Sequence, residues 1–216
     1  MIVVYLITAV QSASLFHNVQ HSQLADDWVL YLPYMANSPW GPLRAVGSAF
    51  IHIGPVHLAL NLIVLFLFGR ELEQALGQAG LVLCFLAGTI GASATIIWVT
   101  PLAPTAGASG ALFAFMALYV AVARQQQRDL RGLVVLILVN VGFTILWSDW
   151  VSVWGHFGGL GVGIALAIAT LLVRPNRGRL VTYFVMCAIS LAAVYWRIAV
   201  LSTGAPNFTV LSNQIL

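Results

Sequence analysis

Residues 54–68 read GPVHLALNLIVLFLF, an apolar stretch in which the strongly polar side chains are His57 and Asn61. Pro55 suits the first position of a helix, and apolar residues fill most positions from 56 to 68. This composition is typical of a membrane span, which needs roughly 20 apolar residues. Polar side chains inside such a span are energetically expensive and usually have a function. The stretch therefore predicts a membrane helix that carries part of a functional site.

The whole chain has the composition of a membrane protein. Of its 216 residues, 61% are hydrophobic and 7% are charged, whereas a soluble domain has roughly 25% charged residues. This excludes a soluble enzyme, a disordered chain and a secreted scaffold held by disulfides. The nine basic residues are all arginines, and they form no cluster that predicts nucleic-acid binding. Cys84 and Cys187 lie in apolar runs and no Cys/His spacing indicates zinc, so we expect neither metal nor cofactor.

Apolar runs predict seven membrane helices and an all-α polytopic fold. The connection at residues 17–53 is too polar to span the membrane and too apolar for a free loop, so we expect it to lie in the outer interface. The first six helices would form one unit over residues 1–178, and a seventh helix with a short outer tail would occupy residues 179–216. The predicted helices are at residues 2–16, 56–68, 80–99, 107–123, 133–147, 154–173 and 180–200.

The arginines predict the orientation, because short cytoplasmic loops are enriched in Lys and Arg. With a cytoplasmic N-terminus, the outer side would hold Arg44 and Arg197. The inner side would hold the other seven, which are Arg70, Arg124, Arg128, Arg131, Arg174, Arg177 and Arg179. We therefore expect an integral membrane protein with its N-terminus in the cytoplasm. We further expect the membrane to be a bacterial inner membrane and the functional site to open to its outer face.

Four polar residues are predicted to lie at a similar depth in the membrane: His57, Asn61, Ser109 and His156. The second, fourth and sixth predicted helices all run inward, and each carries these residues near its N-terminal end. A serine beside a histidine provides a nucleophile and a general base. Free backbone N–H groups near Ser109, together with His57 and Asn61, could bind an oxyanion. The pattern predicts nucleophilic catalysis.

Small residues would let the fourth and sixth helices pack closely enough for Ser109 to reach His156. The fourth helix offers Gly107, Gly110 and Ala114, and the sixth offers Gly155, Gly159 and Gly163. No carboxylate is placed to complete a triad. Glu71, Glu73 and Asp129 belong to the inner side, Asp149 lies in an outer loop, and Asp26 and Asp27 lie in the interfacial segment. We therefore predict a Ser109–His156 dyad.

Four motifs follow one another along the chain: Arg44, His52-xxxx-His57-xxx-Asn61, Gly107-x-Ser109-Gly110 and Gly155-His156-xx-Gly159-xxx-Gly163. With these motifs, residues 44–173 resemble the rhomboid family of intramembrane serine proteases. The resemblance implies a six-helix core with Ser109 as nucleophile and His156 as base. It also implies an oxyanion hole of His57, Asn61 and the Ser109 backbone, transmembrane protein substrates in the lipid bilayer, and a seventh helix of the "6+1" type.

The resemblance further implies supporting residues. Arg44 and His52 would support the first loop, and Glu73 would match a structural Glu after the second helix. There are two departures from the family pattern. Leu43 stands before Arg44 where the family has Trp, and Phe113 occupies the position of an aromatic residue, often Tyr, that stacks on the base. Phe can stack in the same way but has no hydroxyl.

Other interpretations stay open for this sequence. Ser109 alone is more often a helix-packing residue, and His57 with Asn61 could be an interhelical hydrogen-bonded pair. A non-catalytic rhomboid-like protein would bind membrane helices, although it would have no need of both Ser109 and His156. A small-molecule transporter is a further alternative, but the sequence shows no internal repeat and no acidic residue at mid-membrane. A narrower alternative is a rhomboid that processes the sorting tails of secreted proteins. The sequence predicts no oligomeric state.

Overall fold

A computed structural model describes residues 1–173 and 176–204 of the chain, and the described residues form helices joined by loops and turns. The all-α class predicted from the sequence is therefore confirmed. Two 3-10 turns, η1 (Gly41–Leu43) and η2 (Ser48–Phe50), accompany the α-helices. The described α-helices are α1 (Ile2–Gln11), α2 (Gln23–Trp28), α3 (Leu32–Ala36), α4 (Arg44–Gly47), α5 (Gly54–Val99), α6 (Ser109–Gln125), α7 (Arg131–Leu146), α8 (Val153–Leu172) and α9 (Asn176–Gly204).

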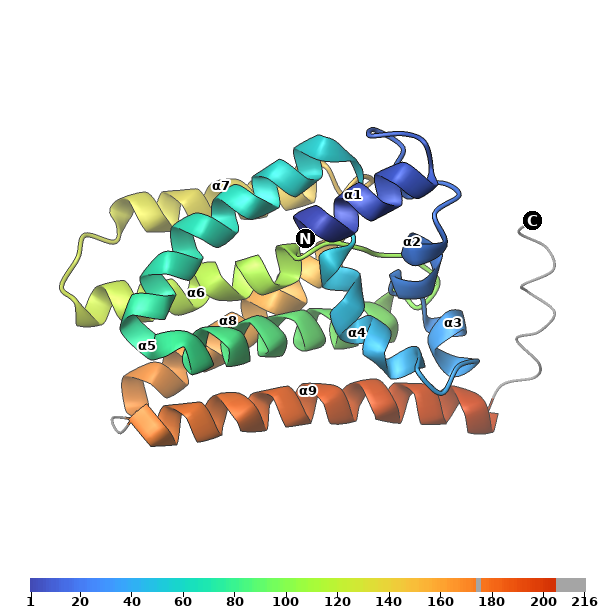
Figure 1. Ribbon diagram of the computed structural model, residues 1–216. Helices are drawn as coiled ribbons and strands as arrows, with labels where there is room; N and C mark the ends of the chain where they lie inside the picture. The colour runs from blue at the N-terminus through green and yellow to red at the C-terminus, as the bar shows by residue number, and fades with distance from the viewer. Residues whose placement is uncertain (174–175, 205–216) are drawn as a thin grey trace.

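Helix α5 contains two of the predicted spans, at residues 56–68 and 80–99, and a kink at Gly77 lies between them. Gly77 has φ +74° and ψ 170°, a backbone conformation that glycine adopts without a steric penalty. In Figure 1, α5 runs to one end of the molecule, turns, and returns beside itself. A Cβ at Gly77 would meet no atom within 4 Å, so the dihedral angles and not crowding favour glycine there.

The helices differ in whether they can cross a membrane. Three of the described helices, α5, α8 and α9, are long and apolar enough, and α6 and α7 are shorter, with 17 and 16 residues. Helix α1 has ten residues. It is therefore about 15 Å long, half of a hydrocarbon core of about 30 Å. The predicted first span at residues 2–16 is wrong in length, because the helix ends at Gln11 and Ala13 adopts a positive φ of 51°.

Helix α6 lies at the centre of the bundle, between α5 and α8 (Figure 1). Twelve of its 17 residues are buried, and they are mostly Ala, Leu, Phe and Met. Helix α9 packs along the returning half of α5, where Tyr183 and Val194 are fully buried. Helix α9, which lies at the place of the predicted seventh helix, therefore adds a layer to the bundle on the α5 side. It begins at Asn176, a few residues before the predicted start.

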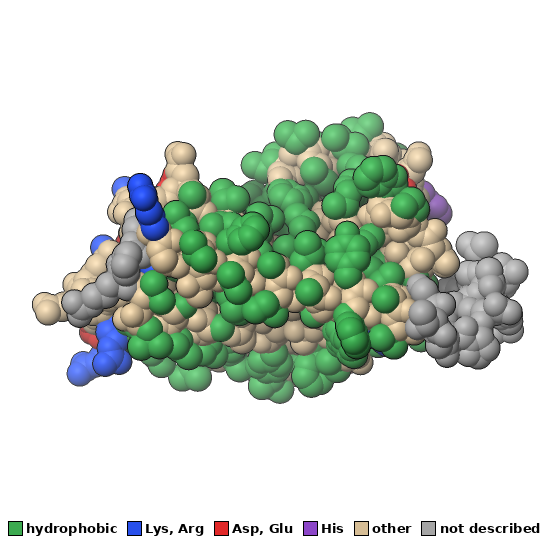
Figure 2. Space-filling view, turned by 90° about the horizontal axis from the view of Figure 1, so that it is seen from below, with side chains coloured by type: hydrophobic (Ala, Val, Ile, Leu, Met, Phe, Trp, Pro, Cys, Tyr) green, Lys and Arg blue, Asp and Glu red, His purple; other side chains and the backbone are tan. Residues whose placement is uncertain are grey.

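The surface is apolar along the length of the helices and charged at one end. Figure 2 shows hydrophobic side chains over the middle of the molecule and arginines gathered at one end. The α6–α7 and α8–α9 connections lie at that end in Figure 1. Among the described residues, five of the arginines predicted to be cytoplasmic lie in or within a helical turn of these connections: Arg124, Arg128, Arg131, Arg177 and Arg179. The segment predicted to be interfacial, residues 17–53 with α2 and α3, lies toward the opposite end. The predicted grouping of the arginines is reproduced, while the side of the membrane that they face stays a prediction.

Candidate active site

Ser109 is the first residue of α6, and the turn before it places its hydroxyl beside a histidine. Gly107 has φ +120°, and its N–H donates to the carbonyl of Ser48 at 2.9 Å. The Ser109 Oγ lies 2.8 Å from His156 Nε2. Because the first N–H groups of a helix have no partner within the helix, donors are also available next to this hydroxyl. A hydroxyl bonded to an imidazole nitrogen can transfer its proton to that nitrogen.

His156 lies in the first turn of α8, and packing fixes its ring. Ser152 caps this helix by accepting a hydrogen bond from the N–H of Gly155 at 3.1 Å. The ring of Phe113 stacks on the imidazole, with centroids 4.4 Å apart and an angle of 20° between the planes. Phe113 therefore occupies the stacking position expected from the resemblance. The side chain of His156 is buried, and its Nδ1 lies 2.8 Å from the hydroxyl of Thr144.

His57 and Asn61 lie on the first turns of α5, on the Gly107 side of the site. The N–H of Ile53 donates to Nδ1 of His57 at 3.3 Å, so Nε2 of that ring is the nitrogen that can carry a proton. The Asn61 amide donates to the carbonyl of His57 at 2.8 Å. Its buried Oδ1 has no partner among the described residues. A donor on each of these two side chains is thus available to a negatively charged oxygen.

Glycines bring the helices of the site into contact. A Cβ on Gly159 would lie 1.9 Å from the carbonyl oxygen of Gly110, and one on Gly163 would lie 2.5 Å from that of Ala114. A Cβ on Gly110 would lie 2.4 Å from the Cβ of Ala92. At the first two places α6 and α8 approach backbone to backbone, and at the third α6 lies against the methyl group of Ala92 on α5. The distance between Ser109 and His156 depends on the approach of α6 and α8.

The residues predicted to support the loop lie in two places. Arg44 donates to the carbonyls of Asp26 at 2.6 Å and Val29 at 3.0 Å, which ties the interfacial segment together. His52 is fully buried, and its ring centroid is 5.2 Å from that of His57. Burial, with a smaller effect of the neighbouring His57, lowers the pKa of His52 to about 4. His52 is therefore a neutral buried residue at pH 7.

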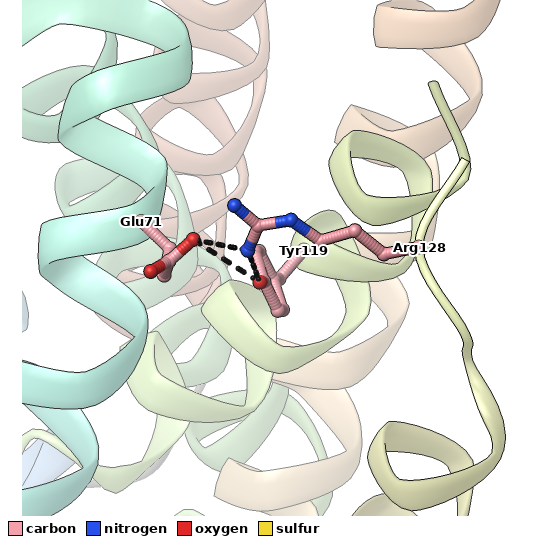
Figure 3. A network of polar contacts seen from close by, with 3 residues as sticks. All are labelled: Glu71, Tyr119 and Arg128. Carbon is pink, nitrogen blue, oxygen red and sulfur yellow. Dashed lines mark hydrogen bonds and ion pairs between the residues drawn. The ribbon is translucent and has the colours of Figure 1, made fainter. Parts of the chain in front are cut away.

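Near the end of the first half of α5, Glu71 and not the predicted Glu73 takes part in a polar network with Tyr119 and Arg128 (Figure 3). Its carboxylate accepts hydrogen bonds from Arg128 at 2.5 Å and from the Tyr119 hydroxyl at 3.2 Å, and Arg128 also donates to that hydroxyl at 2.7 Å. Glu73 is exposed on the other side of the helix turn. The network joins α5, α6 and the α6–α7 connection, and it lies toward the arginine-rich end, far from Ser109 along α6.

Two polar residues near the site were not predicted. The Asn18 side chain is fully buried. It donates to Thr8 Oγ1 at 2.7 Å and to the His52 carbonyl at 2.8 Å, and accepts from the N–H of Gly54 at 2.8 Å, so it fixes the start of α5. Thr144 on α7 contacts His156. A carboxylate near His156 would be recognisable in the sequence as a partner for the imidazole, whereas a neutral Thr inside an apolar helix gives no comparable signal.

A small cavity of about 20 Å³ adjoins Ser109. Its lining includes Ser48, Thr89 and Ser93. The hydroxyl of Thr89 is buried and has no partner among the described residues. A cavity of this volume with polar walls has room for about one water molecule.

Comparison with known proteins identifies relatives of this chain. The family model for the Rhomboid domain matches residues 39–174. The chain is 33% identical over 162 residues to Rhomboid protease GluP of Bacillus subtilis, covering 71% of this chain and 31% of that protein. It is 26% identical over 185 residues to human Rhomboid-related protein 3, covering 77% and 45%, and 29% identical over 174 residues to Rhomboid-like protease 3 of Toxoplasma gondii, covering 76% and 64%. The chain therefore spans less than half the length of the first two of these relatives.

Proposed function

Because the chain belongs to the rhomboid family of integral membrane proteins, we propose that it is an intramembrane serine endopeptidase. Its substrates would be the transmembrane segments of other membrane proteins. The observation that carries the proposal is the 2.8 Å contact between Ser109 Oγ and His156 Nε2. That contact joins two residues that lie 47 positions apart, and it occurs in a part of the bundle where polar side chains are expensive.

The proposed reaction has two steps. Ser109 Oγ attacks the carbonyl carbon of the peptide bond while His156 Nε2 takes its proton. The tetrahedral intermediate then breaks its C–N bond, and His156 gives the proton to the leaving amine. In the second step His156 takes a proton from a water molecule that attacks the acyl-enzyme ester. The bond between the acyl carbon and Ser109 Oγ then breaks, and His156 returns the proton to Oγ. The cavity next to Ser109 is a suitable place for this water, because the Thr89 hydroxyl in its wall has no partner among the described residues.

The negative charge that develops on the carbonyl oxygen needs hydrogen-bond donors. We assign this role to the backbone N–H of Ser109 and to the side chains of His57 and Asn61. The free N–H groups at the start of α6 and the available donors of the two side chains support the assignment. Removal of one such donor typically lowers kcat about 100- to 1,000-fold.

The geometry also bears on the substrate and the orientation. A peptide bond inside a regular helix is shielded by its own hydrogen bonds, so the substrate helix must unwind where it is cut. We therefore expect small or helix-breaking residues at the cleavage site. The positive-inside rule favours a cytoplasmic location for the arginine-rich end. The site would then open toward the outer face of the membrane, which we propose to be a bacterial inner membrane.

The rival is a non-catalytic family member that binds membrane helices. Such a protein would have no use for a serine hydroxyl hydrogen-bonded to a buried imidazole, and this contact favours the protease. A transporter is less well supported, because the sequence shows no internal repeat and no acidic residue at mid-membrane.

The proposal is tested with the purified protein in detergent and a panel of transmembrane substrates. Wild type should cleave at least one of them, and Ser109→Ala and His156→Ala should not. Ser190→Ala, which changes a buried serine on α9 outside the site, is the matched control and should cleave like wild type. A fluorophosphonate should label wild type and not Ser109→Ala. The proposal fails if wild type cleaves no substrate better than Ser109→Ala and is not labelled.

A further inference from the structure

Helix α7 presents a single buried side chain to the site. Of its 16 residues, all of which the structure describes, Thr144 alone is buried, with none of its surface exposed. Its neighbours on the helix are Val, Leu, Ile and Phe, many of which are exposed on the apolar surface. The one residue of α7 that is fully enclosed is thus a polar one, and its hydroxyl lies 2.8 Å from Nδ1 of His156.

The Thr144 hydroxyl has a main-chain carbonyl within reach, and that carbonyl can only accept its hydrogen. Thr144 Oγ1 lies 2.8 Å from the main-chain carbonyl oxygen of Asn140, one turn earlier in α7. A carbonyl oxygen only accepts hydrogen bonds, and a hydroxyl has one hydrogen to give. With that hydrogen on the Asn140 carbonyl, Thr144 Oγ1 must accept from His156, so Nδ1 of the imidazole carries a proton.

The state of Nδ1 determines the state of Nε2. A neutral imidazole has one N–H, so a proton on Nδ1 leaves a lone pair on Nε2. That lone pair faces Ser109 Oγ at 2.8 Å and can accept the hydroxyl proton. If Thr144 instead donated its hydrogen to Nδ1, the proton of the neutral imidazole would be on Nε2, and Nε2 could not act as a base. It would also leave the Thr144 and Asn140 oxygens 2.8 Å apart with no hydrogen between them.

We propose that Thr144, oriented by the Asn140 carbonyl, is a positioning residue that selects the base-competent tautomer of His156. This inference rests on the proposed function, since it concerns the same site. The chain of hydrogen bonds runs from Ser109 through His156 and Thr144 to the carbonyl of Asn140. In a catalytic triad a carboxylate orients the imidazole and selects its tautomer, and here Thr144 takes that role. Because the partner is neutral, it fixes the tautomer without adding a charge to the apolar bundle.

The tautomer can be measured without any substrate. Protein labelled with 15N in its histidines is studied by NMR in detergent, and His156→Ala identifies the His156 signals by difference. Wild type should show a protonated Nδ1 and an unprotonated Nε2. In Thr144→Val, which keeps the branched shape and lacks the hydroxyl, the population should shift toward the other tautomer. A wild type with its proton on Nε2 would overturn the proposal.

Kinetics provide the second test. Thr144→Val should lower kcat roughly ten- to a hundredfold, the expected effect of an unpaired buried donor, and leave KM nearly unchanged. Thr144→Ser keeps a hydroxyl and should restore most of kcat. Thr144→Ala removes the hydroxyl in a residue with high helix propensity, so it replaces the Val variant if that variant does not fold. Thr182→Val is the matched control, because Thr182 donates in the same way to the carbonyl of Gly178 on α9 and is far from the site.

The outcomes separate the two proposals. If wild type and Thr144→Val cleave with equal kcat, the role of Thr144 is refuted and the protease assignment stands. If wild type cleaves no substrate and is not labelled by the fluorophosphonate, but the tautomer changes as expected, the assignment of Thr144 stands and the protease proposal fails. If Thr144→Val and Thr144→Ser lose activity equally, together with thermal stability, Thr144 has a packing role only.

Discussion

Gly107 lies against the ring of His57 so closely that a Cβ on Gly107 would be 2.7 Å from His57 Cε1 and 2.8 Å from its Nε2. The two residues belong to different helical segments, the turn before α6 and the first turn of α5. Two independent constraints therefore act on this glycine, the space taken by the imidazole and its own φ of +120°. Both constraints concern a residue two positions before the candidate nucleophile, Ser109.

Gly107→Ala should inactivate the protein and destabilise it. The positive φ alone costs of order 1–3 kcal/mol for a residue with a side chain, and the new methyl group would also push His57 away from the site. Cleavage and thermal unfolding in detergent measure the two effects. Gly132→Ala on α7 is the control, because a Cβ there meets nothing within 4 Å and no positive φ is involved. Normal activity in Gly107→Ala would contradict this account of the site.

Gly159→Ala should separate α8 from α6. The methyl group would lie 1.9 Å from the main-chain oxygen of Gly110, and a backbone cannot move aside as a flexible side chain can. Overpacking of this kind costs about 1–3 kcal/mol, and the separation should weaken the Ser109–His156 contact. We expect a lower melting temperature and slower fluorophosphonate labelling. Gly161→Ala on the same helix, where a Cβ meets nothing within 4 Å, should show neither effect.

Phe113→Leu should reduce kcat by removing the ring that stacks on His156. Aromatic stacking contributes about 0.5–1.5 kcal/mol beyond area burial, which corresponds to a change of roughly two- to twelvefold. Phe113→Tyr restores the residue frequent in the family and keeps the ring, so most of the activity should remain. Initial rates on one substrate, at equal amounts of folded protein, compare the two. Equal activity of the Leu variant and wild type would show that stacking does not orient the base.

Acid should destabilise the protein partly through His52. Its pKa is about 4 in the folded protein and 6.5 when unperturbed, so the unfolded chain binds the proton first as the pH falls. Above pH 6.5 the residue is neutral in both states and costs nothing. Stability is lost as the pH falls from 6.5 toward 4. The melting temperature of His52→Gln should therefore decrease less over this window than that of wild type.

The control for this prediction is His17→Gln, which changes an exposed histidine in the interfacial segment. Both variants lose one histidine, so a difference between them reports the buried position of His52. If the melting temperatures of His52→Gln and wild type fall in parallel with pH, the pKa of His52 is the same in the folded and unfolded protein, and the prediction is wrong.

Several features of the fold and site could be predicted from the sequence because they depend on local pattern. The apolar stretch with His57 and Asn61 four residues apart predicted a helix with both on one face, and the Asn61 amide does bond to the His57 carbonyl in that helix. The glycines at 155, 159 and 163 repeat every four residues, which is the helical spacing of a close contact.

Other features depend on how the helices rotate and cross, and local pattern says little about that. Glu71 and Glu73 are two residues apart and therefore point in different directions, and the position of Arg128 on the α6–α7 connection decides which of them is paired. Helix α1 ends five residues earlier than predicted, because a local turn at Ser12 and Ala13 interrupts an apolar run that continues to Phe16.

The sequence by itself determined that this is a helical membrane protein of the rhomboid family with Ser109 and His156 as candidate reactive residues. Composition, helical period and motif order are properties of the linear sequence, so each is recognisable without knowledge of how the helices pack. Only the tertiary structure decided that Ser109 and His156 are 2.8 Å apart and that the second nitrogen of His156 meets Thr144. A hydrogen bond depends on distances of a few tenths of an ångström between helices, and those distances are fixed by the glycine contacts of α5, α6 and α8.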